Sequence, residues 1–235
     1  AWAIPFADRM TLLLTLFILL LVILKESEKF VDRQINLLLQ ETYEQLNDKI
    51  KNEDVSIERV TKGIQITLRG NLFQSMKANV NKNYIPIIQE ISKIIEDCRL
   101  FNIGETEQYS ALMKFLEDRN EELNVEIRCE GHTDDAILPP KSDFSNNWEL
   151  SSARSLKVVN IMNDASSISE KYFSYNGYGE FRPLINVSGI DDFQKKKQAR
   201  AYNRRVEIYL DAFARPKTRS SEAEFVKMLD NKFKK

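Results

Sequence analysis

The chain has 235 residues, of which 43% are hydrophobic and 29% charged, and its formal net charge at pH 7 is -1. This length leaves room for one membrane span and one compact domain of roughly 100–150 residues. The charge balance argues against a nucleic-acid partner, two cysteines are too few for a disulfide framework, and a single histidine excludes any site that needs two.

Residues 1–24 form the first predicted element, a single transmembrane helix. No charge occurs between Arg9 and Lys25, and about 20 mostly apolar residues are what a helix rising ~1.5 Å per residue needs to cross ~30 Å of hydrocarbon. An alternative interpretation is an uncleaved signal anchor in which Asp8 and Arg9 lie at the lipid headgroups, because charges at a span end reach the interface at little cost.

Asp8 is the unusual residue of this segment. A carboxylate near a spanning helix costs on the order of 3 kcal/mol at mid-bilayer, and such residues usually face a protein interior or a water path. At helical spacing Thr11 and Thr15 share its face. We therefore expect Asp8, Thr11 and Thr15 to form an ion-binding site that packs against a partner.

Residues 25–53 are charged but periodic, which predicts an amphipathic helix. This helix has three candidate placements: pairing with its own copy, packing on the membrane surface, or docking on the following domain. We favour the first, a parallel two-chain contact, because a heptad-like stripe provides a seam. The stripe consists of Ile35, Leu39, Tyr43, Leu46 and Ile50.

Residues 54–213 are expected to form one domain in which helices alternate with strands around a small mixed sheet, an α/β (α+β) fold. A β-hairpin is predicted at 55–60 and 63–68, and further strands at 125–130, 172–175 and 205–210. Helices are predicted from Pro86, over about 105–122, over 147–163 and near 192–201. Residues 214–235 are interpreted as a tail that is a short helix or disordered.

The segment from Cys129 to Asp135 gathers a thiol, an imidazole and three carboxylates. Neither metal-ligand spacing nor a hydrolase triad accompanies it, so we expect no metal site, no cofactor and no enzymatic activity. We expect Asp134 instead to accept a hydrogen bond from an ammonium group of a ligand. Asn147, Arg154 and Arg204 would then bind a carboxylate of the same ligand. The structural alternatives are that Asn147 caps the following helix and Arg154 is a solvated helix residue.

Four motifs now become informative together: Gly131-His-Thr-Asp-Asp135, Ser145-Asn-Asn-Trp-Glu-Leu-Ser-Ser-Ala-Arg154, Gly177-Tyr-Gly-Glu-Phe-Arg-Pro183 and Asn203-Arg-Arg-Val-Glu-Ile208. They resemble the OmpA-like peptidoglycan-binding domain, in the version found in MotB. Trp2, Ala7-Asp-Arg-Met-Thr11 and Phe17 resemble the MotB transmembrane signature, from which Arg9 departs.

The resemblance implies specific roles for these residues. Asp8 would be the carboxylate that takes up the driving ion, a proton or alternatively sodium. Asp134 and Arg154 would hold the two ends of diaminopimelate in the peptidoglycan stem peptide. The implied peptidoglycan contacts are Asp134, Asn147, Leu150, Arg154 and Arg204.

The resemblance also implies an environment and partners. The chain would be a single-pass protein of the bacterial inner membrane, with its N-terminus in the cytoplasm and its domain in the periplasm. It would work as a homodimer inside a pentamer of A-subunits of the MotA or ZorA kind. For residues 25–53 the family offers a competing role to the dimer seam, a plug that blocks ion flow until the motor engages.

An oxidising periplasm would also permit a disulfide between Cys98 and Cys129, because both are predicted to point into the domain interior. The alternative is two buried free thiols, since a disulfide needs Cα atoms within ~7 Å.

The function implied is that of a B-subunit of an ion-driven rotary motor anchored to peptidoglycan. Two specialisations compete, the motor of Zorya-type anti-phage defence, which the short linker favours, and the flagellar stator. A rival of another class is a passive wall-anchored structural protein without an ion function.

Overall fold

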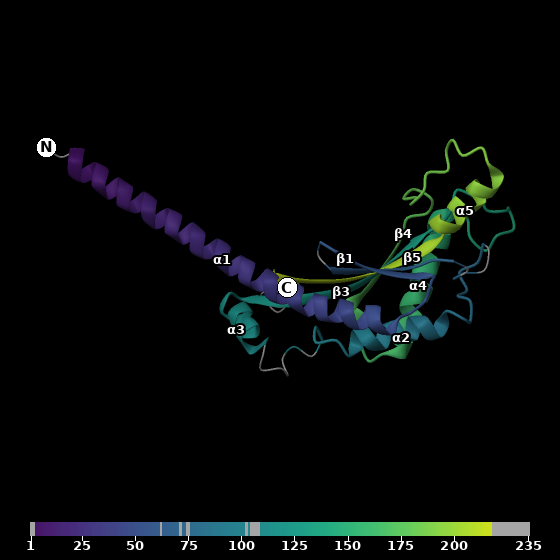
Figure 1. Cartoon of the computed structure of the whole chain (residues 1–235), viewed down its shortest axis with the longest axis horizontal. Helices are drawn as coiled ribbons and strands as arrows, with labels where there is room; N and C mark the ends of the chain where they lie inside the picture. Colours follow the sequence, from purple (N-terminus) through teal and green to yellow (C-terminus); the bar gives the residue numbers. More distant parts are fainter. Residues whose placement is uncertain are drawn as a thin grey trace, which may run out of the picture.

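In the computed structural model of the chain, the structure describes residues 3–61, 63–70, 72–73, 76–101, 103 and 109–217. One helix, α1 (Ala3–Lys49), has 47 residues and is therefore about 70 Å long. Its first half extends away from the folded part, and its second half lies against that part (Figure 1). The two predicted helices, 1–24 and 25–53, are thus one continuous helix.

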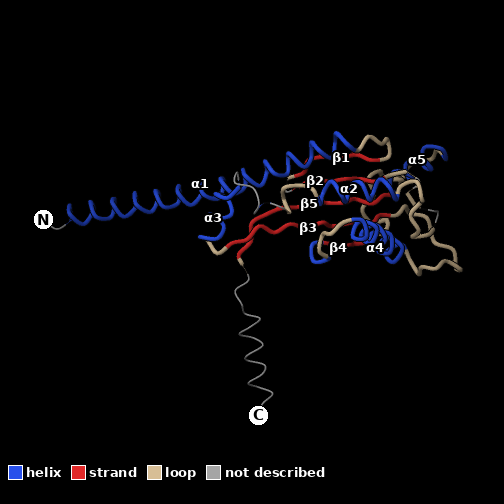
Figure 2. The backbone as a smooth tube through the Cα atoms, turned by 90° about the horizontal axis from the view of Figure 1, so that it is seen from below, coloured by secondary structure: helices blue, strands red, loops and turns tan. Residues whose placement is uncertain are grey.

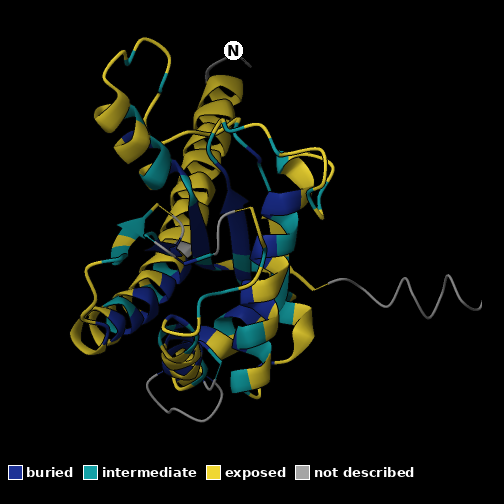
Figure 3. Cartoon of the chain, turned by 90° about the vertical axis from the view of Figure 1, so that its right-hand side faces the viewer, coloured by how far each residue is buried: buried dark blue, intermediate teal, exposed yellow. Residues whose placement is uncertain are grey.

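The first half of α1 is the transmembrane candidate. Among the described residues, this is the one helix long and apolar enough to cross a membrane. Every side chain from Pro5 to Glu26 is exposed (Figure 3). An apolar surface of this length needs lipid or partner helices around it.

The domain is built on a five-stranded mixed sheet in the order β1-β2-β5-β3-β4. Its strands are β1 (Val55–Val60), β2 (Gly63–Leu68), β3 (Glu121–His132), β4 (Phe173–Gly177) and β5 (Arg205–Pro216). β3 and β4 are parallel, and the other neighbours are antiparallel. The α+β fold prediction is confirmed.

Helices cover one face of this sheet. They are the second half of α1, α2 (Ile85–Glu96) and α4 (Asn147–Ala165). In Figure 2 α1 and α2 run alongside the strands, and α4 is seen nearly end-on. The inward residues of β3 are fully or nearly buried, for example Ile127 and Cys129, whereas Glu126 and Arg128, which alternate with them, are only partly buried. Strand alternation therefore gives the sheet one core face and one polar face.

The predicted stripe on residues 25–53 belongs to this core. Ile35, Leu39 and Leu46 are at most 4% exposed and Ile50 is 8% exposed, while Tyr43 is partly buried. Phe30 adds an edge-to-face contact with Phe115. The favoured dimer seam is thus wrong for these residues, because the chain's own domain buries them; the docking alternative is the observed one.

The remaining elements differ from the prediction mainly at their ends. α3 (Ser110–Asp118) is shorter than the predicted helix, and Asn120, with φ 56°, turns the chain directly into β3. Residues 105–108 of that prediction lie outside the described residues. β5 continues to Pro216 because it pairs with β3 along the whole strand, so the predicted boundary at 213 falls inside it. The predicted tail lies outside the described residues from 218 onward.

The predicted disulfide is wrong. Cys98 and Cys129 are both free and buried. Cys98 follows α2 and contacts Thr42 of α1, whereas Cys129 sits in the centre of the sheet opposite Ile208. Burial raises the pKa of Cys98 to about 11 and also raises the pKa of Cys129.

Candidate functional site

The site forms where β3 ends and β5 begins. These two strands are antiparallel neighbours, and His132 pairs with Arg205 at their ends. Asp134, two residues past one strand, therefore meets Arg204, which immediately precedes the other. Helix α5 (Phe193–Asn203) leads into Arg204 and lies at the end of the molecule opposite the N-terminus (Figure 1).

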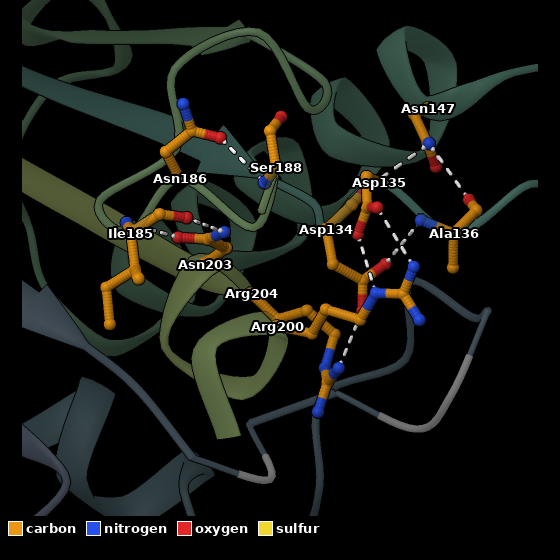
Figure 4. Close-up of polar contacts among 10 residues, drawn as sticks. All are labelled: Asp134, Asp135, Ala136, Asn147, Ile185, Asn186, Ser188, Arg200, Asn203 and Arg204. Atoms are coloured by element: carbon orange, nitrogen blue, oxygen red, sulfur yellow. Dashed lines mark hydrogen bonds and ion pairs between the residues drawn. The ribbon is translucent and has the colours of Figure 1, made fainter. Parts of the chain in front are cut away.

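Asp134 and Arg204 form a direct ion pair. Arg204 Nη1 donates to Asp134 Oδ2 at 2.6 Å (Figure 4). The carboxylate side chain is 14% exposed and the guanidinium side chain 38% exposed, so one edge of the pair faces solvent. The other oxygen, Oδ1, accepts the backbone N–H of Ala136, which fixes the carboxylate within its own turn.

A second ion pair fastens α5 to the same loop. Arg200 donates from Nε and Nη2 to the two oxygens of Asp135, at 2.6 and 2.9 Å (Figure 4). This two-point hydrogen bond lowers the pKa of Asp135. Arg200 was not among the predicted site residues; its place one helical turn before Arg204 was the available signal.

Asn147 holds the loop from the other side. Its Nδ2 donates to the backbone carbonyls of Ala136 at 3.1 Å and Asp134 at 3.4 Å (Figure 4). The cap of α4 is Asn146, whose side chain accepts the N–H of Glu149. The alternative that Asn147 serves as the cap is therefore wrong, because its neighbour does so.

Leu150 and Arg154 continue the pocket face of α4, at three and seven residues after Asn147. Both are only 2% exposed. Arg154 donates from Nε to the carbonyl of Lys77 at 3.0 Å, and its guanidinium lies 4.9 Å from the centre of the Phe73 ring. Burial, together with nearby Arg204 and against the opposing effect of Asp134, lowers its pKa to about 10.

The alternative that Arg154 is a solvated helix residue is thus wrong. Phe73 and Lys77 are contacts that the sequence analysis missed, since no motif in that segment points to the site.

All five predicted binding residues line one pocket of about 60 Å³. One carboxylate and two guanidiniums line it together with an amide. The chemistry of this set suits a small zwitterion, whose ammonium group would pair with the carboxylate and whose carboxylate would pair with a guanidinium. The pocket lining is Met76, Thr133, Asp134, Ala136, Leu138, Asn147, Leu150, Arg154 and Arg204.

The predicted ion site lies elsewhere, on the exposed half of α1 (Figure 1). Thr11 Oγ1 donates to the carbonyl of Asp8, and Thr15 Oγ1 donates to the carbonyl of Leu12, both at 2.8 Å. The hydroxyl protons are thus used within the helix, and their oxygen lone pairs stay on the face of Asp8.

Near the ends of β3 and β5 that meet at the site, Glu130, His132 and Glu207 place one potential ligand atom each within 4.8 Å of one another. Their carboxylates already bind guanidiniums, Glu130 that of Arg128 and Glu207 that of Arg205. Two arginines beside two carboxylates leave little net charge for a cation, so this arrangement works as a buried ion-pair network.

Two known families match separate parts of the chain. Residues 1–36 match the family described as membrane MotB of the proton-channel complex MotA/MotB, and residues 101–197 match the OmpA family. The OmpA match includes Asp134, Asn147, Leu150 and Arg154, and ends before Arg204.

Among curated relatives, Motility protein B of Bacillus subtilis is 28% identical over 70% of this chain and 51% of its own length. The chain thus spans about half the length of this relative.

Solved structures share the fold. A MotB-like protein from Desulfovibrio vulgaris is 18% identical, with a TM-score of 0.55 over 80% of this chain and 99% of that chain. The cell wall anchor of the T6SS from Pseudomonas aeruginosa is 23% identical, with a TM-score of 0.50 over 73% of this chain and 97% of that chain.

Proposed function

Since the chain is a MotB-type protein with an OmpA-like domain, we propose that it is the wall-anchoring B-subunit of an ion-driven rotary motor. The observation that carries this proposal is the combination, on one chain, of an exposed apolar helix bearing Asp8 and, at the opposite end, a pocket lined by Asp134, Arg154 and Arg204. The helix holds the protein in the bacterial inner membrane, and the pocket holds peptidoglycan.

The ligand of the pocket is the stem peptide of peptidoglycan. Diaminopimelate carries an ammonium and a carboxylate at its free end, which matches a pocket lined by Asp134, Arg154 and Arg204. Binding of the full-length protein in detergent to purified sacculi tests this assignment, because loss of Asp134 removes the ammonium acceptor and should abolish most sedimentation.

Asp8 carries the transported ion, a proton, with sodium as the alternative. One elementary charge that crosses ~100 mV releases ~2.3 kcal/mol, which is comparable with the ~3 kcal/mol cost of a charged carboxylate in lipid. Neutralisation of Asp8 can therefore gate one step of rotation. A passive structural protein would need no such residue, and an Asp8→Asn variant with full biological output would favour that rival.

The apolar half of α1 is exposed along its length, which supports partners in the membrane. We assign these as a pentamer of A-subunits of the MotA or ZorA kind and a second copy of this chain. The N-terminus is then cytoplasmic and the domain periplasmic.

For the biological role we favour the motor of Zorya-type anti-phage defence. The observation behind this choice is that α1 enters the wall-binding domain without a linker. The flagellar stator is the second candidate, because the likeness to Motility protein B extends over 70% of the chain. Phage plaque counts and swimming halos in a deletion strain separate the two, with the Asp8→Asn variant as the inactive control.

A further inference from the structure

Two aromatic side chains beside the pocket are stacked and yet exposed. The rings of Trp148 and Phe181 lie 5.1 Å apart, centroid to centroid, with 26° between their planes. Trp148 is 48% exposed and Phe181 is 61% exposed. A stacked pair normally forms part of a core, so its position at the surface requires an explanation.

The pair is fixed to the elements that build the pocket. Trp148 directly follows Asn147 in the first turn of α4. Phe181 follows the turn at Gly179, whose N–H donates to Ser151 Oγ and whose carbonyl accepts the N–H of Thr133, each at 2.9 Å. Gly179 has φ 54°, and a Cβ placed on it would lie 3.5 Å from both the backbone N of Trp148 and Cδ2 of Phe181. The turn therefore sets the two rings at a defined position relative to the pocket loop.

The pocket itself is too small for more than one end of a stem peptide, since its volume is about 60 Å³. The remainder of any peptidoglycan fragment must lie outside it, on the neighbouring surface. A stem peptide is attached to a sugar of the glycan strand, so a sugar lies within a few residues of the bound end. Pyranose rings present a face of C–H groups, which pack on an aromatic ring whose face carries partial negative charge.

We propose that Trp148 and Phe181 form an aromatic platform that packs on a sugar ring of the glycan strand, next to the pocket that binds the stem peptide. This inference rests on the proposed function, and it adds a second contact with a different part of the same polymer. The pocket then selects the peptide, and the platform adds affinity for peptide that is still attached to glycan.

The test compares three probes on the full-length protein in detergent: intact sacculi, the free diaminopimelate-containing tetrapeptide, and glycan strands stripped of peptide by an amidase. The variants are Trp148→Ala and Phe181→Ala. Trp148→Phe, which keeps an aromatic ring, is the conservative variant. Phe213→Ala removes another exposed ring, 39% exposed, from the far end of β5 and is the matched control.

We expect Trp148→Ala and Phe181→Ala to weaken binding to sacculi and stripped glycan by about 3- to 10-fold, the effect of losing one aromatic contact. Their affinity for the free tetrapeptide should stay as in the wild type. Trp148→Phe should retain most of the sacculus binding, and Phe213→Ala all of it. In a Trp2→Phe background, where Trp148 is the remaining tryptophan, stripped glycan should change the fluorescence and the free tetrapeptide should not.

Two results would overturn the platform. Unchanged sacculus binding by both alanine variants would mean that the rings carry no contact. An equal loss for the tetrapeptide and the sacculi would mean that they only shape the pocket. Failure of the proposed function looks different: the wild type would then bind neither tetrapeptide nor sacculi. If the protein bound glycan in a Trp148-dependent manner but did not bind the tetrapeptide, the aromatic platform would be supported and the assignment of the stem peptide to the pocket would be contradicted.

Discussion

His132 and Arg205 face each other across β3 and β5, and this pairing sets the position of both charges of the Asp134–Arg204 ion pair. The register of two antiparallel strands thus determines the geometry of the pocket, because a shift of one residue would turn the flanking side chains to opposite faces. The binding charges come from loops, but the sheet fixes their separation.

The first prediction concerns Asp134. Asp134→Ala should reduce the affinity for sacculi by about 10- to 150-fold, since a hydrogen bond to a charged group contributes roughly 1.5–3 kcal/mol. Co-sedimentation of the full-length protein with sacculi measures it. Asp135→Asn is the matched control, because that carboxylate pairs with Arg200 outside the pocket lining. Equal losses for the two variants would contradict a specific role for Asp134.

The second prediction concerns Asp8. Asp8→Asn should leave membrane insertion and sacculus binding intact and abolish motor output, because an amide cannot release a proton or balance a cation. Asp8→Glu should keep part of the output. Co-purification with the A-subunit measures assembly, and phage resistance or swimming measures output. Full output from the Asn variant would show that the ion does not use this carboxylate.

The third prediction separates core packing from dimerisation in the second half of α1. Leu39 is fully buried, so Leu39→Ala should lower the free energy of unfolding by about 2–5 kcal/mol. Leu37→Ala, at a position 49% exposed, should change it by less than about 0.5 kcal/mol. Urea unfolding followed by circular dichroism makes the comparison. A seam between chains would instead give a concentration-dependent midpoint that Leu39→Ala removes.

The fourth prediction concerns acid stability. Burial opposes ionisation of Glu207, but the interactions with His132, Tyr209 and Arg205 outweigh it, and its pKa is lowered from 4.5 to about 2. A lowered pKa in the folded state stabilises the protein above pH 4.5, and this stabilisation is lost as the pH falls toward 2.

Between pH 6 and pH 2, protonation of Glu207 should lower the free energy of unfolding by on the order of 3 kcal/mol. Urea titrations at intervals from pH 6 to pH 2 measure it. Glu207→Gln should be less stable at neutral pH, where it leaves Arg205 without its carboxylate, and its stability should fall less steeply with acid. Parallel curves for the two proteins would contradict the assignment to Glu207.

The fifth prediction concerns the thiols. Cys98 and Cys129 are buried and have raised pKa values, so neither should react with a thiol reagent in the native protein at pH 8. Two thiols should titrate after denaturation without reductant. A change in electrophoretic mobility on reduction would show instead that Cys98 and Cys129 form a disulfide.

Sequence patterns located the site better than they located the packing of α1. Asp134, Asn147, Leu150, Arg154 and Arg204 sit in motifs beside predicted strands and a helix, so their convergence followed from the topology. The periodicity of α1 predicted its apolar stripe, but periodicity alone does not identify the surface that buries this stripe. The contacts of Arg154 with Phe73 and Lys77 join residues about 80 positions apart and have no local signal.

The continuity of α1 also fixes an angle. The exposed apolar run reaches Leu24, and the first buried residue among the described side chains is Val31, so six residues lie between them and about 10 Å of helix separates the span from the domain. A straight helix keeps a constant phase of about 100° per residue. The azimuth of the peptidoglycan pocket is therefore tied to the azimuth of Asp8, and any rotation of the span about its axis swings the wall contact through the same angle.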